Sequence, residues 1–140
     1  MHAFGSPCHL VVENSTDRGD ELLSLCQNEL RRLEDKFSSY EPDSVISRIN
    51  QAAGTGAHIP LDAESRSLFN YVGALWDESK HIFDPSTRLL KNCYDDDGQL
   101  LASEEQLRGI LKLVGWSNLE INEDGANLTK KGMLIDLNSC

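Results

Sequence analysis

The spacing of apolar residues changes once along this chain, and that change limits the folds open to it. In several stretches between residues 20 and 114, apolar side chains recur every three or four positions, as on one face of an amphipathic helix. From Leu119 onward they alternate with polar residues, as in strands that bury one face. A chain of 140 residues with this pattern is the right size for a single α+β domain.

Local signals place the helices. Asp62 stands where it can cap a helix that carries apolar residues up to Trp76, and Ser103 with Gln106 has the spacing of a capping box. The longest predicted helix covers residues 20–37, and its apolar face consists of Leu22, Leu23, Cys26, Leu30, Leu33 and Phe37.

Strands are predicted at the two ends of the chain. An early one covers residues 9–13, and three later ones cover 119–121, 126–129 and 133–137, separated by turns that contain glycine. Consecutive strands with short turns pair antiparallel. We therefore expect one domain in which helices pack on a mainly antiparallel sheet.

The charge balance excludes one broad class of partner. Thirteen basic against 23 acidic residues give a net charge of −10, which repels the phosphate backbone of nucleic acids. A single phosphate-bearing ligand stays compatible with this charge, because one phosphate is held by local donors. No apolar run approaches the ~20 residues of a transmembrane helix, and the sequence shows no leader. As written it predicts a cytoplasmic protein, or a periplasmic one if a leader has been removed.

Two weaker site signals remain as alternatives. The four cysteines are too irregularly spaced for a structural zinc site and indicate free thiols. Asp95, Asp97, Gly98 and Glu104 match several positions of an EF-hand calcium loop. The first ligand position of that loop is Cys93, a soft thiol where calcium requires oxygen.

Several short segments stand out because of their residues, order and spacing. They are FGSPC at 4–8, FSSYEPDSVISRIN at 37–50, FDPS at 83–86, VGW at 114–116 and GMLIDLNS at 132–139. Together they resemble the signature motifs of the FAD:protein FMN transferase family, also called the ApbE family. The resemblance covers nearly the whole chain but only about the first half of a typical family member.

The resemblance implies a fold, a reaction and a set of site residues. The fold would be the first half of the ApbE fold. The reaction would transfer FMN from FAD to a threonine or serine hydroxyl of an acceptor flavoprotein, with Mg²⁺ as cofactor and AMP as the leaving product. Ser139 falls at a metal-ligand position of the family. The positions that match flavin-nucleotide contacts are Phe4, Tyr40, Ile82, Phe83, Asp84 and Asp136.

The chain also departs from the family pattern. Arg88 stands near a position where many members carry glycine, so we expect it to narrow the cofactor loop. The match predicts one ApbE-like domain over residues 1–140, the N-terminal portion of the family fold, without the metal ligands that members carry later. The leading hypothesis is a flavin transferase. The alternative is a shortened, non-catalytic module that binds a flavin nucleotide or docks a partner.

Overall fold

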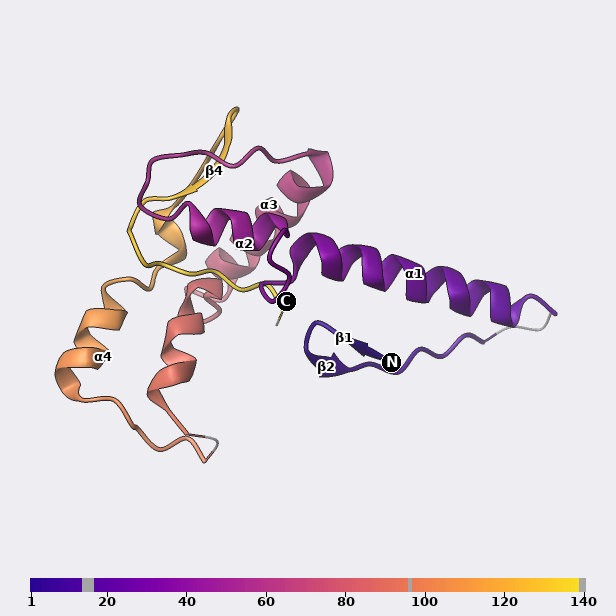
Figure 1. Cartoon of the computed structure of the whole chain (residues 1–140), viewed down its shortest axis with the longest axis horizontal. Helices are drawn as coiled ribbons and strands as arrows, with labels where there is room; N and C mark the ends of the chain where they lie inside the picture. The colour runs from indigo at the N-terminus through magenta and orange to yellow at the C-terminus, as the bar shows by residue number, and fades with distance from the viewer. Residues whose placement is uncertain (14–16, 96, 139–140) are drawn as a thin grey trace.

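The computed structural model describes residues 1–13, 17–95 and 97–138, and it confirms the α+β prediction (Figure 1). The elements follow in the order β1 (His2–Ala3), β2 (Ser6–Pro7), α1 (Gly19–Phe37), α2 (Val45–Gln51), α3 (Ala63–Glu78), the 3₁₀ helix η1 (Pro85–Cys93), α4 (Glu104–Leu111), the 3₁₀ helix η2 (Trp116–Asn118), β3 (Leu119–Asn122) and β4 (Gly125–Leu128). None of the helices among the described residues combines the length and the hydropathy of a transmembrane span.

Helices α3 and α4 begin where the capping signals predict. The Asp62 carboxylate accepts a hydrogen bond of 2.8 Å from the backbone N–H of Ser65 at the start of α3. Ser103 and Gln106 form the full capping box at the start of α4. Each cap satisfies donors that the first turn of a helix leaves free. Both predicted caps are therefore present in the folded chain.

The hydrophobic core lies between α2, α3 and the C-terminal segment. Ile46 and Ile49 from α2 and Phe69 from α3 are almost completely buried there. The Phe69 ring stacks against Trp116, with ring centroids 6.0 Å apart. Met133 and Ile135 close the core from the other end of the chain.

Helix α1 confirms the predicted range but leaves the body of the molecule. Figure 1 shows it projecting from the core as an arm, with the β1–β2 hairpin and the N-terminal segment alongside. Phe37, at its C-terminal end, is its only fully buried residue. We call residues 19–30 of this helix the α1 arm.

The sheet is smaller than predicted. β3 and β4 pair antiparallel, with Leu119 opposite Leu128, and β1 pairs antiparallel with β2 in a separate sheet. Gly125 begins β4 with φ +135°, and a Cβ there would collide with the carbonyl group of Ile59. This close approach lets Ile59 bridge to Ala126 at the edge of the sheet.

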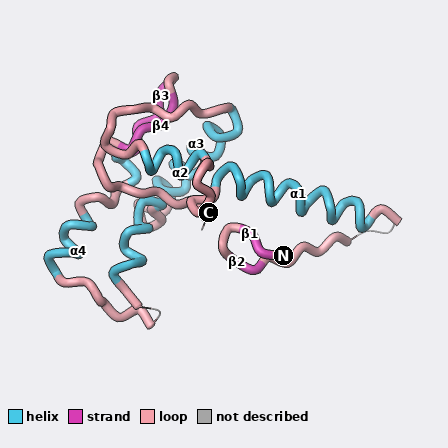
Figure 2. Tube along the Cα trace, viewed as in Figure 1, coloured by secondary structure: helices cyan, strands magenta, loops and turns pink. Residues whose placement is uncertain are grey.

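Two predicted strands are wrong. Residues 9–13 form no regular strand, and Val11 is 84% exposed, because no other described strand runs beside them. Residues 133–137 are also loop, as Figure 2 shows for the C-terminal segment. Their side chains alternate in burial as in a strand, but the Ile135 N–H donates to the Asn50 side chain and the Asp136 N–H donates to the Pro85 carbonyl at the start of η1.

Candidate functional site

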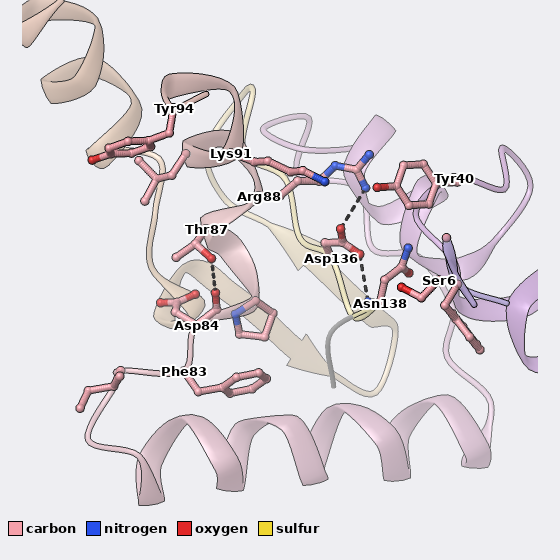
Figure 3. A pocket seen from close by; sticks show the side chains of 15 residues that line it. Ser6, Tyr40, Phe83, Asp84, Thr87, Arg88, Lys91, Tyr94, Asp136 and Asn138 are labelled. Atoms are coloured by element: carbon pink, nitrogen blue, oxygen red, sulfur yellow. Dashed lines mark hydrogen bonds and ion pairs between the residues drawn. The ribbon is translucent and has the colours of Figure 1, made fainter. Parts of the chain in front are cut away.

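A pocket of about 610 Å³ opens where several of the conspicuous sequence segments meet (Figure 3). Its walls come from the β1–β2 turn, the loop after α1, residues 82–91 and the C-terminal segment. All six positions predicted from the resemblance line this one pocket: Phe4, Tyr40, Ile82, Phe83, Asp84 and Asp136. Residues separated by up to 132 positions in the sequence therefore share one cavity.

The β1–β2 turn forms one rim of the pocket. Phe4 and Gly5 are the two turn residues, with φ of +53° and +76°, as expected for a tight two-residue hairpin. A positive φ is unusual for a bulky residue such as Phe4. Its backbone N–H donates to the Glu34 carboxylate at 2.6 Å, which ties the turn to α1. Gly5 lies against the Tyr40 ring, where a Cβ would be 3.4 Å from the ring edge.

The loop after α1 contacts the C-terminal segment through Ser39. Its hydroxyl donates to the Asp136 carboxylate at 3.0 Å, and its backbone N–H donates to the Asn138 side chain at 3.4 Å. Asp136 also accepts from the Asn138 backbone N–H at 3.0 Å. These contacts place Asp136 beside Tyr40, whose side chain is 57% exposed.

Asn50 fixes the C-terminal segment from the other side. Its side-chain amide donates to the carbonyl oxygen of Ile135 at 2.9 Å and accepts from the same residue's N–H at 2.8 Å. This pair of bonds replaces the strand partner that the sequence predicted. The next N–H, from Asp136, donates to the Pro85 carbonyl at 2.9 Å. The segment is therefore held between α2 and the start of η1.

Asp84 connects two further segments. Its carboxylate accepts four hydrogen bonds, from the N–H and hydroxyl of Ser86 at 2.8 and 2.6 Å, from the Trp76 indole at 3.2 Å and from the Trp116 N–H at 3.1 Å. The Ser86 hydroxyl in turn accepts from the Gly115 N–H at 2.6 Å. Asp84 therefore lines the pocket while its carboxylate anchors the FDPS segment to the VGW segment.

We call this set of side-chain bonds the motif junction. It comprises the contacts of Ser39, Asn50, Asp84, Ser86 and Asp136 described above. Its members come from three of the segments singled out in the sequence, at 37–50, 83–86 and 132–139, and they bond to a fourth, VGW at 114–116. The junction shapes the pocket wall.

The turn after α3 presents Ile82 and Phe83 to the pocket. Lys80 and His81 both adopt left-handed backbone conformations, with φ of +55° and +66°, and reverse the chain. The His81 ring stacks on Trp76 with centroids 3.6 Å apart. Phe83 packs on the core, whereas Ile82 is 88% exposed. Ile82 is thus an apolar side chain at the pocket rim that a ligand can cover.

Arg88 reaches across the pocket from η1. It donates to the Ser39 hydroxyl, its Nη1 lies 3.3 Å from the Asp136 carboxylate, and its guanidinium carbon lies 4.8 Å from the centre of the Tyr40 ring. Sequence reasoning singled out Arg88 but missed Ser39 and Lys91 as lining or positioning residues. Ser39 directly precedes Tyr40 in a matched segment, and Lys91 follows Arg88 by one 3₁₀ turn, so both signals were present.

The described residues do not form a metal site. Among residues 1–13, 17–95 and 97–138, no group of three or more His, Cys, Asp or Glu side chains is placed to hold an ion. Ser139, the predicted metal ligand, lies outside the described residues. In the acidic turn, Asp95 accepts from the backbone N–H groups of Asp97 and Gln99, at 3.1 and 2.7 Å. This carboxylate closes its own turn, an arrangement common in loops.

A second cavity, the α1–α3 groove, lies next to the pocket. Its volume is about 660 Å³, and it shares Phe4 and Asn138 with the pocket. Apolar side chains make up most of its remaining wall, namely Leu33, Phe37, Leu68, Tyr71 and Leu137.

Four charged residues at the edge of this groove form the α1–α3 ion network. Lys36 lies 2.6 Å from Asp62 and 2.5 Å from Glu64, and Arg32 lies 2.5 Å from Glu64. Hydrogen bonds from Arg32 and Lys36 lower the pKa of Glu64 to about 2. The bond from Lys36, helped by Ser65, likewise lowers the pKa of Asp62.

Known proteins resemble the chain in both sequence and fold. The sequence model of the ApbE family matches residues 4–140. The crystal structure of the ApbE protein from Thermotoga maritima superposes with a TM-score of 0.82 at 24% identity, covering 99% of this chain and 46% of that one. The apo flavinyl transferase ApbE of Pseudomonas stutzeri gives a TM-score of 0.71 at 25% identity, covering 86% and 39%.

A third solved structure, the flavin transferase ApbE from Vibrio cholerae, shares the fold with a TM-score of 0.75 at 16% identity, covering 91% of this chain and 42% of that one. The chain spans less than half the length of each of these proteins. None of the functionally curated proteins compared with the chain matches it. The family model accounts for all but the first three residues, and the fold agrees with it over the same range, so the chain belongs to the ApbE family.

Proposed function

We propose that this chain forms the part of an FAD:protein FMN transferase that binds the flavin nucleotide. One observation carries the proposal: four sequence segments that resemble the family motifs fold onto a single pocket, and all six predicted contact residues line it. If these six residues served core packing alone, they would have no reason to gather around one cavity. Family membership and the fold shared with solved flavin transferases support the same activity.

The pocket has the chemistry that a flavin requires. Ligand sites combine apolar and aromatic walls with a few polar groups that fix orientation. Here Tyr40 offers an exposed ring, Phe4 and Ile82 offer apolar surface at the rim, and Asp136 offers a carboxylate. A planar isoalloxazine or adenine ring would cover these exposed side chains and remove their apolar area from water.

In the proposed reaction, the hydroxyl oxygen of an acceptor threonine or serine attacks the FMN phosphorus of FAD. A new phosphorus–oxygen bond forms, the bond to the AMP oxygen breaks, AMP leaves and the hydroxyl proton is released. The contribution of the described residues is to bind and orient the nucleotide.

Magnesium belongs to the family-level proposal, but the described donors do not fit a Mg²⁺ site. Asp136 already bonds to Ser39, Arg88 and the Asn138 backbone, and Asp84 bonds to four donors. Mg²⁺ requires near-octahedral oxygen ligands. No step of the reaction is therefore assigned to an ion held by these residues.

Flavin binding by a matched pair of tyrosine variants tests the proposal. Tyr40 and Tyr71 are exposed to similar extents, 57% and 60%, but only Tyr40 lines the pocket. We expect the fluorescence of FAD to be quenched when it binds. Tyr40→Ala should raise the dissociation constant about tenfold, because it removes an aromatic stacking contact of ~1–1.5 kcal/mol. Tyr71→Ala should leave the dissociation constant unchanged. Equal loss in both variants, or no FAD binding by the unaltered chain, would reject the site.

The second candidate function is a flavin-binding or partner-docking module without turnover. It is favoured by the lack of a metal-ligand cluster among the described residues. Incubation with FAD, Mg²⁺ and an acceptor protein separates the two functions. AMP release coupled to flavin on the acceptor supports the transferase, whereas retained FAD without AMP supports the module.

A further inference from the structure

Two cations share one face of the 3₁₀ helix η1. A 3₁₀ helix has about three residues per turn, so side chains at positions i and i+3 lie above one another. Arg88 and Lys91 have this spacing, and both line the candidate pocket. Figure 3 shows both side chains extending from η1 toward Tyr40. A positive edge thus occurs in a chain whose net charge is −10.

The two acids that line the same pocket pair with only one of these two cations. Asp84 lies at the other end of the pocket in Figure 3, beside Phe83, and its carboxylate accepts four protein hydrogen bonds. Asp136 pairs with Arg88 at 3.3 Å. Lys91 has no ion pair or hydrogen bond with any residue that the structure describes. Its ammonium group is therefore available to a ligand.

Arg88 is held in place before any ligand arrives. Of its nitrogens, only Nη1 bonds to described residues, namely to Ser39 and Asp136, while the guanidinium lies over the Tyr40 ring. Arginine has five N–H donors in a fixed plane, so three of them, on Nε and Nη2, remain for a ligand. A side chain that is already ordered loses less entropy when it binds an anion.

We infer that Arg88 and Lys91 bind the phosphate groups of a nucleotide whose planar ring lies against Tyr40. The pocket therefore selects phosphorylated flavins over riboflavin. This inference rests on the proposed function, since it assumes that the ligand of the pocket is a flavin. It adds the residues that distinguish a nucleotide from the bare ring system.

A comparison of two ligands, one with a phosphate group and one without, tests the inference. Binding of FMN and of riboflavin is measured by flavin fluorescence for the unaltered chain and for Lys91→Gln, Arg88→Gln and Arg88→Lys. We expect the chain to prefer FMN, and Lys91→Gln to reduce that preference about tenfold, the size of one charge-assisted hydrogen bond. Riboflavin affinity should stay the same in Lys91→Gln. Arg88→Lys should retain part of the preference that Arg88→Gln loses.

Lys112→Gln is the matched control. It removes one positive charge from an exposed lysine that does not line the pocket. The preference for FMN should fall with rising salt in the unaltered chain and less steeply in Lys91→Gln. Equal effects of Lys112→Gln and Lys91→Gln, or equal binding of FMN and riboflavin by the unaltered chain, would overturn the inference and leave the proposed function standing.

Inorganic pyrophosphate provides a readout that needs no flavin. We expect saturable NMR shifts at the amides of η1, and their loss in Lys91→Gln. Pyrophosphate binding at η1 without binding of FMN or riboflavin would reject the proposed flavin function and retain the anion site. Absence of both pyrophosphate and flavin binding would reject both.

Discussion

The motif junction and the α1 arm use side chains in opposite ways. In the junction, polar side chains are half-buried or buried and are bonded to one another: Ser86 is completely buried and connects Asp84 to Gly115. In the arm, apolar side chains lie at the surface, with Leu22 36% and Leu25 57% exposed. Buried polar groups cost free energy unless they are paired, so the junction depends on each bond. Among the residues that the structure describes, the arm makes no comparable set of contacts.

This difference shows what kind of sequence signal specifies tertiary contacts. Helical spacing of apolar residues predicts that α1 has an apolar face but not what covers that face. Short polar motifs have no periodicity, yet their side chains pair only in one arrangement, and that arrangement brings distant segments together. Changes in the junction should therefore affect both folding and the pocket, and changes in the arm should affect neither.

The largest expected effect is at Asp84. Asp84→Ala leaves the Trp76 indole and the Trp116 N–H without their acceptor, and we expect it to lower the free energy of unfolding by about 3 kcal/mol. Urea unfolding followed by tryptophan fluorescence measures the loss. Asp77→Ala, at a carboxylate whose side chain is 73% exposed, should change stability by less than about 0.5 kcal/mol. Equal stability of the two variants would contradict the role of Asp84 in the junction.

The next effect is at Asn50. Asn50→Ala leaves both backbone groups of Ile135 unpaired, which should cost about 2 kcal/mol. Hydrogen exchange should then be faster at the Ile135 N–H than at amides of α3. Asn70→Ala, on the exposed face of α3, is the control and should leave the unfolding midpoint nearly unchanged. Unchanged exchange at Ile135 would show that the C-terminal segment is held by other contacts.

A smaller, pH-dependent effect lies at the root of the arm. Because the pKa values of Asp62 and Glu64 are lower in the folded protein than in the unfolded chain, the unfolded chain binds more protons in acid. The stability contributed by the α1–α3 ion network is thus complete above about pH 4.5 and is lost as the pH falls toward about 2.

Urea midpoints measured across this pH range should show the loss, and 1 M salt should reduce it, since these groups are exposed. Lys36→Gln removes the partner shared by both acids and should flatten the pH profile. A profile that is unchanged in Lys36→Gln would assign the acid sensitivity to other carboxylates.

The smallest effect is expected on the arm itself. Leu25→Gln keeps helix propensity and removes an exposed apolar side chain, so stability should change by less than about 0.5 kcal/mol. Ile49→Ala, in the core, should cost about 3 kcal/mol under the same conditions. A large loss in Leu25→Gln would show that the arm is covered in solution, and it would remove the contrast between the two regions.

Much of the local structure was predictable. The bounds of α1, the Asp62 cap and the Ser103–Gln106 capping box depend on neighbours within one or two helical turns. The loop conformation of residues 133–137 was not predictable, because the alternation of buried and partly buried residues is the same whether the partner is a strand or the Asn50 side chain. Periodicity reports which side of a segment is buried, not which group bonds to its backbone.

The candidate site was predictable only in part. The resemblance identified six positions that line the pocket, but their roles as flavin contacts, and that of Ser139 as a metal ligand, stay predictions. The extent of the domain, residues 1–140, likewise stays a prediction. The pairing of Arg88 with Ser39 and Asp136 had no signal in spacing, since the partners are separated by 49 and 48 positions.

The sequence by itself determined the α+β class, the helix starts and membership of the ApbE family, because these depend on local patterns and short motifs. Only the tertiary structure decided that Asp84 anchors two segments, that Asn50 replaces a strand and that Arg88 and Lys91 face one pocket. The physical reason is that hydrogen bonds and ion pairs act over a few ångströms. Which groups come within that range depends on how the helices pack.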